Sequence, residues 1–153
     1  MAVAPFEMAA ALAQNIVDHP KFCAAALHFQ QKPNQGNLLI ATCALEDDTG
    51  ATLPGLTLQL EIRRPLIVDR WQFEFGLFLL QDGHRKRVYQ LHSSPSDKRS
   101  HNAKDGPLYG PHEHIGDSVT AVVLTDSADP ASVFALYCKR INLIYTGKIE
   151  FPL

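Results

Sequence analysis

Two stretches in the middle of the chain alternate apolar and polar residues, and this alternation limits the possible folds more than any other feature. Residues 56–62 place Leu or Ile at every second position, with Thr, Gln and Glu between them. Residues 71–79 repeat the pattern with Trp, Phe and Leu. Side chains of a strand point alternately to opposite faces, so both stretches predict strands with one buried and one wet face. Such a sheet needs a second layer to cover its apolar face.

Helical patterns at both ends of the chain can supply that layer. Apolar residues recur at four-residue spacing in 5–17, which predicts a helix with Pro5 in its first turn. A second helix is predicted over about 21–31, with an apolar face that begins at Phe22. Near the C-terminus, Asp129 and Pro130 are typical of a helix start, and an apolar stripe follows over 130–141.

The remaining segments predict more strands and one long loop. Strands are expected at 38–45, 87–92 and 112–125, and the tail 143–151 suits an edge strand. Residues 81–84 carry a hairpin signal. Residues 93–110 are polar and rich in Ser, Asp, Gly and Pro, which predicts a long and often functional loop.

The sequence therefore predicts an α+β fold: an antiparallel sheet of five to six strands, with the N-terminal helix or helices and one C-terminal helix (about 130–141) packed on it. The 153 residues suit a single domain, 1–153, with a helical segment 1–35 followed by the sheet and C-terminal helix, 36–153. The residues expected to be buried are Leu58, Leu60, Phe73, Phe75, Leu77, Val133, Phe134 and Tyr137.

The charge, the cysteines and the N-terminal sequence indicate the kind of partner and the cellular compartment that suit this protein. The formal net charge is −2, so the protein as a whole is not a polyanion binder, and any attraction to nucleic acid needs a local patch. Cys23, Cys43 and Cys138 are widely spread without a CxxC pair, which favours free thiols in a reducing compartment. No basic N-terminal region or long apolar run is present, so we expect a cytoplasmic protein without a membrane segment.

The strongest local signal is a basic, histidine-rich segment. Five of the seven histidines fall within 84–114, and residues 84–104 hold six basic residues against one acidic residue. Within 110–116, the sequence Gly-Pro-His-Glu-His-Ile-Gly places His112 and His114 two residues apart. On a strand they would share one face and Glu113 would point away, while His101 could supply a third ring.

Three functions compete for this segment. His101, His112 and His114 could bind a divalent metal as neutral imidazoles, although the glutamate of the cupin metal motif is missing. The same histidines could work without metal as acid and base on a phosphodiester, with Lys98 or Arg99 stabilising the developing charge. The third alternative is a solvated basic surface that contacts a partner without catalysis.

The order of several motifs resembles a family of small uncharacterised bacterial and phage proteins, over about residues 56–142. These motifs are Arg-Val-Tyr-Gln-Leu-His at 87–92, His-Asn at 101–102 with Asp-Gly at 105–106, Gly-Pro-His-Glu-His at 110–114, then Phe134, Cys138 and Ile141. The chain departs from the family at Gln90, often basic, at 103–104, where a Pro is expected, and between Cys138 and Ile141, where it has one residue more. The resemblance implies that His101, Asn102, His112 and His114 form one site, and it assigns that site no reaction.

We therefore expect an interaction module that uses the basic, histidine-rich surface 84–116, with a histidine-dependent nuclease or phosphodiesterase, or a metal-dependent enzyme, as the alternative. The partner would be acidic, either nucleic acid or a host protein. No cofactor is expected, with a divalent metal as the alternative. The predicted contact residues are Arg85, Arg87, Lys98, Arg99, Asn102 and Lys104.

Overall fold

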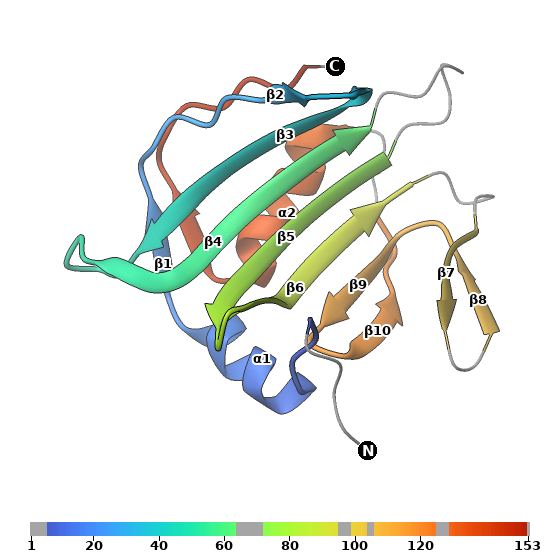
Figure 1. Cartoon of the computed structure of the whole chain (residues 1–153), viewed down its shortest axis with the longest axis horizontal. Helices are drawn as coiled ribbons and strands as arrows, with labels where there is room; N and C mark the ends of the chain where they lie inside the picture. Colours follow the sequence, from blue (N-terminus) through green and yellow to red (C-terminus); the bar gives the residue numbers. More distant parts are fainter. Residues whose placement is uncertain (1–5, 64–71, 95–98, 104–105, 125–128, 153) are drawn as a thin grey trace.

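The computed structural model describes residues 6–63, 72–94, 99–103, 106–124 and 129–152, and it shows an α+β fold. Two α-helices, α1 (Ala10–Asp18) and α2 (Pro130–Arg140), lie against one large sheet (Figure 1). The strands are β1 (Lys21–Cys23), β2 (Gln30–Lys32), β3 (Gln35–Glu46), β4 (Thr52–Arg63), β5 (Gln72–Gln81), β6 (His84–Ser93), β7 (Arg99–Ala103), β8 (Gly106–Tyr109), β9 (His112–Ile115), β10 (Ser118–Ala121) and β11 (Leu143–Tyr145).

Nine of the described strands form a single, mostly antiparallel sheet. Its order is β10-β9-β6-β5-β4-β3-β1-β11, with β2 paired to β3 beside this path. Only the pairing of β1 with β11 is parallel among these strand pairs. The remaining two strands, β7 and β8, form a separate hairpin. The central strands β3 to β6 are the longest. Next to β6, the sheet continues with β9 and β10, which contain His112 and His114 and the residues that follow them.

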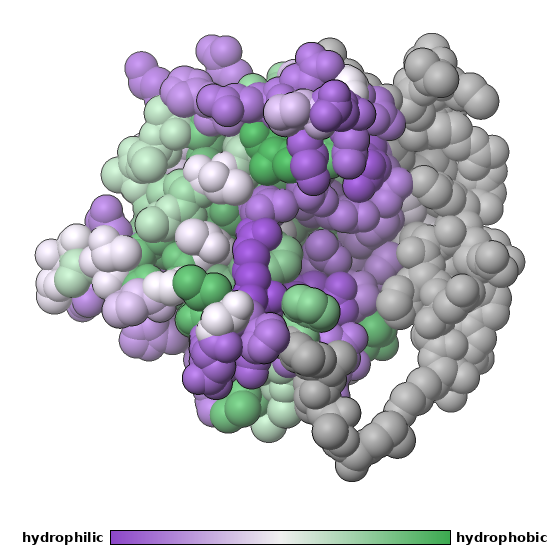
Figure 2. Space-filling view, viewed as in Figure 1, coloured by the Kyte–Doolittle hydropathy of each residue, from purple (hydrophilic) through white to green (hydrophobic). Residues whose placement is uncertain are grey.

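The core lies between one face of this sheet and α2. Every residue that the alternation predicted to be buried is buried, and Leu58, Leu60, Phe75 and Leu77 are completely so. Phe134 of α2 packs its ring edge against Phe75, with the ring centroids 6.2 Å apart. The other face of the sheet is turned away from α2, and hydrophilic residues gather over part of it (Figures 1 and 2).

The start of α2 is confirmed, since Asp129 accepts hydrogen bonds from the backbone of Ala131 and Ser132 and Pro130 stands in the first turn. The first helix begins later than predicted, at Ala10, and Pro5 lies outside the described residues. The backbone N–H of Ala10 donates to the carboxylate of Asp117, in the turn between β9 and β10. This bond attaches α1 to the sheet at the β9–β10 turn, next to the strand that carries His112 and His114.

The predicted second helix is wrong, because the described chain over 21–31 forms β1 and β2 instead. Phe22 pairs with Ile144 of β11 on one side and with Glu46 of β3 on the other, and Leu27 forms a bridge with Ile149. These partners lie far away in the sequence, so the helical propensity of the alanines at 24–26 is overridden by pairing that a local pattern cannot reveal.

The predicted strand count of five to six is also too low, for related reasons. The short strands β1 and β2 come from the segment expected to be helical, and 112–125 is not one strand but the hairpin of β9 and β10. Gly116 turns this hairpin with a φ of +55°, a conformation that favours glycine. Likewise, the described part of the expected long loop 93–110 holds the β7–β8 hairpin.

Neither helix in the described part of the chain combines the length and the apolar character that crossing a membrane requires.

Candidate functional site

Four ionisable residues form a straight row across the polar face of the sheet. Glu61 of β4 pairs with Glu74 of β5, Glu74 pairs with His92 of β6, and His92 pairs with His112 of β9. Residues opposite each other on neighbouring strands share a face, so all four side chains point away from α2. We call this set the carboxylate–imidazole row. Figure 2 shows hydrophilic residues gathered on the same face.

Three imidazoles meet at the β9 end of the row. The rings of His92 and His112 stack with centroids 4.6 Å apart, and His114 meets His112 edge-on at 5.0 Å. All three are buried, with exposed fractions of 4%, 1% and 2% respectively. The prediction that His112 and His114 lie side by side is therefore confirmed, and the period of two along a strand explains it.

Polar contacts orient two of these rings. Nδ1 of His112 lies 3.3 Å from the carbonyl oxygen of Gly110, and because this oxygen can only accept, Nδ1 is the donor in the contact. Nδ1 of His92 lies 3.5 Å from Oε1 of Glu74. A carboxylate beside an imidazole holds the orientation of the ring, as in many acid–base sites.

The two glutamates of the row act as a pair. Burial raises the pKa of Glu61, and a hydrogen bond and charge repulsion from Glu74 raise it further. Each carboxylate also accepts an amide hydrogen bond of 2.9 Å from its own strand, Glu61 from Gln59 and Glu74 from Gln72. The proximity of a second carboxylate therefore makes Glu61 take up a proton at a higher pH than an isolated glutamate would.

The residue between the two histidines of β9 faces the opposite way, as predicted. Glu113 accepts a 2.7 Å hydrogen bond from the hydroxyl of Tyr89, and Arg140 of α2 lies 3.8 Å from the same carboxylate oxygen. These contacts attach β9 to the helix side of the sheet. They fix the orientation that directs His112 and His114 to the polar face.

The exposed part of the segment is the basic start of β6. Arg85 is exposed, and its guanidinium donates to the amide oxygen of Gln59 at 2.6 Å and lies 4.0 Å above the ring of Phe78. Arg87 is half-buried, and burial lowers its pKa while the charges of Glu7 and Glu74 act against that shift. Its buried Nε has no hydrogen-bond partner among the described residues.

The other predicted residues are only partly placed. The backbones of Arg99, His101 and Asn102 lie in β7, outside the nine-stranded sheet, and nothing is described of their side chains. Lys98 and Lys104 lie outside the described residues, as does Trp71. Among the described residues, no group of three or more His, Cys, Asp or Glu side chains is arranged to hold a metal ion.

Sequence reasoning missed Glu61, Glu74 and His92 as members of the site. All three stand at polar positions of an alternating strand. The alternation predicts which face of the sheet their side chains occupy, but not which residues of neighbouring strands lie beside them. Their meeting depends on the register of four strands, and β6 is shifted by a bulge near Phe78. A cross-strand register of this kind is not encoded in any local pattern.

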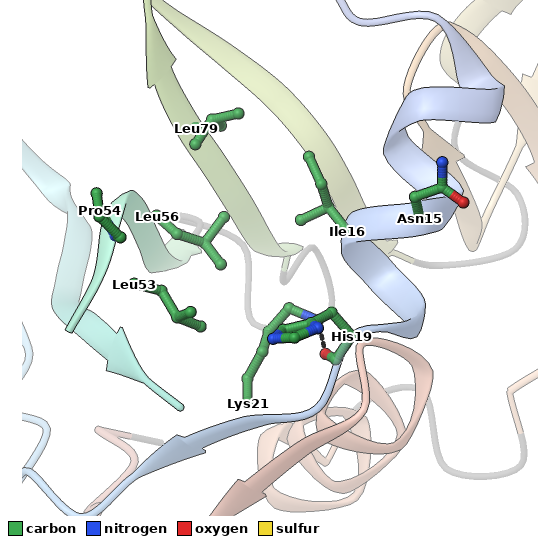
Figure 3. A pocket seen from close by; sticks show the side chains of 8 residues that line it. All are labelled: Asn15, Ile16, His19, Lys21, Leu53, Pro54, Leu56 and Leu79. Atoms are coloured by element: carbon green, nitrogen blue, oxygen red, sulfur yellow. Dashed lines mark hydrogen bonds between the residues drawn. The ribbon is translucent and has the colours of Figure 1, made fainter. Parts of the chain in front are cut away.

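A separate hollow of about 340 Å³ lies beside the end of α1, lined by Ile16 and by Leu53 and Leu56 of β4 (Figure 3). The ammonium of Lys21 at its edge donates to three backbone carbonyls, of Val17 at 3.0 Å, His19 at 2.6 Å and Ile141 at 2.7 Å. Because an ammonium has three hydrogens, this lysine has no donor left for a ligand and joins the C-terminal ends of α1 and α2 instead.

Comparison with known proteins gives no further assignment. No protein-family model matches the chain, and neither a curated protein nor a solved structure shows significant similarity to it.

Proposed function

We propose that this chain is an interaction module that binds the phosphate backbone of a nucleic acid through the exposed start of β6. One observation carries the proposal: within the described part of 84–116, Arg85 is exposed whereas the three imidazoles are 4% exposed or less. A partner that approaches the polar face meets guanidinium groups before it meets imidazoles. An acidic partner suits such a surface.

The arrangement around Arg85 favours phosphate over a general acidic surface. Its guanidinium is held by Gln59 and by the ring of Phe78, so its remaining N–H groups are oriented in advance. A planar guanidinium binds phosphate oxygens in pairs, and less conformational entropy is lost when it is already fixed. Arg87 follows two residues later on β6 and is half-buried, so its positive charge adds to the attraction of a phosphate near Arg85.

Nearby acidic groups set the expected pH dependence. Glu61 and Glu74 lie on the same face and oppose an anion, and the pKa of Glu61 is raised by burial and by Glu74. Since the pKa of Glu61 is raised, lowering the pH toward its pKa removes negative charge from the face. Binding of a polyanion should therefore strengthen as the pH falls from neutrality toward 5.

The test measures binding of fluorescently labelled single-stranded RNA and DNA to the purified protein by anisotropy, over a series of salt concentrations. We expect affinity to fall steeply with salt, and the double variant R85Q/R87Q to bind at least about tenfold more weakly, since each phosphate contact contributes. The matched control K139Q removes an exposed charge from α2 and should bind as the parent does. Absence of binding to both nucleic acids at low salt would reject our proposal and would leave an acidic host protein as the alternative partner.

A second candidate function is general acid–base cleavage of a phosphodiester. It is favoured by the contact between Glu74 and His92 and by the stacking of His92 on His112. One imidazole would remove the proton of an attacking hydroxyl, and a second, protonated imidazole would give a proton to the leaving oxygen. Because the rings are buried, this chemistry requires the site to open before a substrate enters.

Incubation of RNA with the parent and with H112A/H114A, in EDTA and separately with zinc or manganese, decides between these candidates. Cleavage by the parent in EDTA, absent in the double variant, would support the acid–base function. Cleavage only with metal would support the metal-dependent alternative that includes His101. Tight, salt-sensitive binding without cleavage supports the interaction module, for which we propose a cytoplasmic location.

A further inference from the structure

Two cysteines that are 20 residues apart in the sequence meet at the edge of the core. Cys23 lies on β1 and Cys43 on β3, two antiparallel neighbours in the sheet. Their sulfur atoms are 3.1 Å apart, and both are free thiols. A disulfide bond needs a sulfur separation of about 2.05 Å, so the two atoms are about 1 Å from bonding distance.

The two thiols differ in their access to solvent. Cys43 is partly exposed, whereas Cys23 is 3% exposed and belongs to the core cluster. Burial and the hydrogen bond with Cys23 raise the pKa of the Cys43 thiol, so little of it is thiolate at neutral pH and its reaction is faster in alkaline solution. Because Cys43 is the more exposed of the two, an external disulfide reaches it first, and Cys23 is the thiol placed to react next.

We propose that Cys23 and Cys43 form a reversible disulfide that links β1 to β3 when the protein meets an oxidising thiol pool. The Cys43 thiolate attacks a small disulfide such as oxidised glutathione, forms a mixed disulfide and releases one glutathione thiol. Cys23, after losing its proton, then attacks the Cys43 sulfur of the mixed disulfide and releases the second glutathione. Two protein thiols are oxidised by two electrons, and one glutathione disulfide is reduced to two thiols.

The bond would strengthen the edge of the sheet where β1, from the N-terminal part of the described chain, meets β11, from its C-terminal part. β1 pairs with β11 as well as with β3, and Lys21 at its start holds the carbonyls of both helix ends. A covalent link at Cys23 therefore restrains β1 against separation from the sheet and closes a loop that includes β2. The site lies away from the start of β6, so the inference does not depend on the proposed function.

The protein is equilibrated with oxidised glutathione at pH 8.5, alkylated without reduction and digested with trypsin. The bond between Lys32 and Pro33 resists trypsin, so both cysteines fall on one peptide, 22–63, while Cys138 falls on 105–139. We expect peptide 22–63 to lose two hydrogens and carry no alkyl group, and peptide 105–139 to carry one. Dithiothreitol should restore two alkyl groups on 22–63.

Thermal unfolding supplies a second measurement. The oxidised parent and the oxidised C138S variant should melt about 5 °C or more above their reduced forms, because the link restrains the unfolded chain. C23A and C43A should show no such rise, and their circular dichroism spectra test that they fold. Full alkylation of 22–63 after oxidation, or a stable mixed disulfide on Cys43 without reaction of Cys23, would overturn the proposal. Nucleic-acid binding of the reduced protein is unaffected by either result.

Discussion

The hydroxyl of Tyr89 donates a 2.7 Å hydrogen bond to the carboxylate of Glu113, and this contact attaches β9 to the sheet from the side of α2. The two residues are offset by two positions in the register, since Tyr89 itself pairs with Ile115 and Glu113 pairs with Leu91. Burial and the charge of Glu113 raise the pKa of Tyr89, so the phenol keeps its hydrogen for this bond. Glu113 stands between His112 and His114, so we expect this bond to help position the imidazoles on the opposite face.

We expect Y89F to destabilise the protein by about 1–3 kcal/mol, because a half-buried carboxylate loses its donor. The imidazole resonances of His112 and His114 in NMR spectra should shift as well. The control Y137F removes the 2.6 Å bond to the carbonyl of Gly76, at a similar cost in urea denaturation. If Y137F moves these imidazole resonances as much as Y89F does, the bond to Glu113 does not position β9.

The carboxyl pair predicts a pH dependence of stability. The folded pKa of Glu61 is raised above its unfolded value, so its contribution is present below the unfolded pKa and is lost as the pH rises through the folded pKa. E61Q should imitate the protonated carboxyl, which donates to Glu74, and should lose less stability than the parent between pH 4 and 7. Urea denaturation over this pH range measures the difference, and the exposed E150Q serves as control. Parallel profiles for the parent and E61Q would contradict a raised pKa of Glu61.

The lowered pKa of Lys21 predicts a second pH dependence of stability, at high pH and in the opposite direction to that of Glu61. Burial lowers its pKa from 10.5 to about 8, with an opposing attraction from Asp18. Between these values the unfolded chain binds more protons than the folded one, so this residue makes stability rise with pH. K21M, which leaves three backbone carbonyls without their donor, should cost about 3–5 kcal/mol at pH 7.

Because K21M lacks this titration, the stability gap between the parent and K21M should widen from pH 8 to 10. The exposed K139M should change stability by less than about 0.5 kcal/mol at either pH. A gap that narrows above pH 8 would mean that the carbonyls hold the ammonium charged and that its pKa is not lowered.

The turn between β9 and β10 leaves no room for a side chain. A Cβ at Gly116 would lie 2.4 Å from the carbonyl oxygen of Met8 and 3.0 Å from Cα of Ala10, both backbone atoms. G116A should therefore add a steric cost to the strain of its positive φ, for a total of about 3 kcal/mol or more. G83A isolates the strain, since Gly83 has a φ of +74° and no atom within 4 Å, and should cost about 1–2 kcal/mol. If urea denaturation shows that G116A and G83A lose the same free energy of unfolding, the start of α1 moves away from residue 116 without cost.

The elements predicted correctly from the sequence are those specified by nearby residues. The alternation at 56–62 and 73–79 and the Asp129–Pro130 start of α2 identify their elements without knowledge of the fold. The segment 21–31 was wrong because long-range pairing of Phe22 and Leu27 decides its conformation. Of the candidate site, the shared face of His112 and His114 could be predicted, but their alignment with Glu74 could not, because it requires the register of β5, β6 and β9.

The parallel pairing of β1 with β11 has a consequence for how the chain is made. Lys21 donates to a carbonyl 120 residues further along, and Phe22 must wait for Ile144 to complete its strand pair. A nascent chain on the ribosome can assemble the β3–β6 meander early, but β1 stays without its outer neighbour until residue 145 has left the exit tunnel. The long sequence separation of this contact should make closure of the β1–β11 edge a late and slow step in folding.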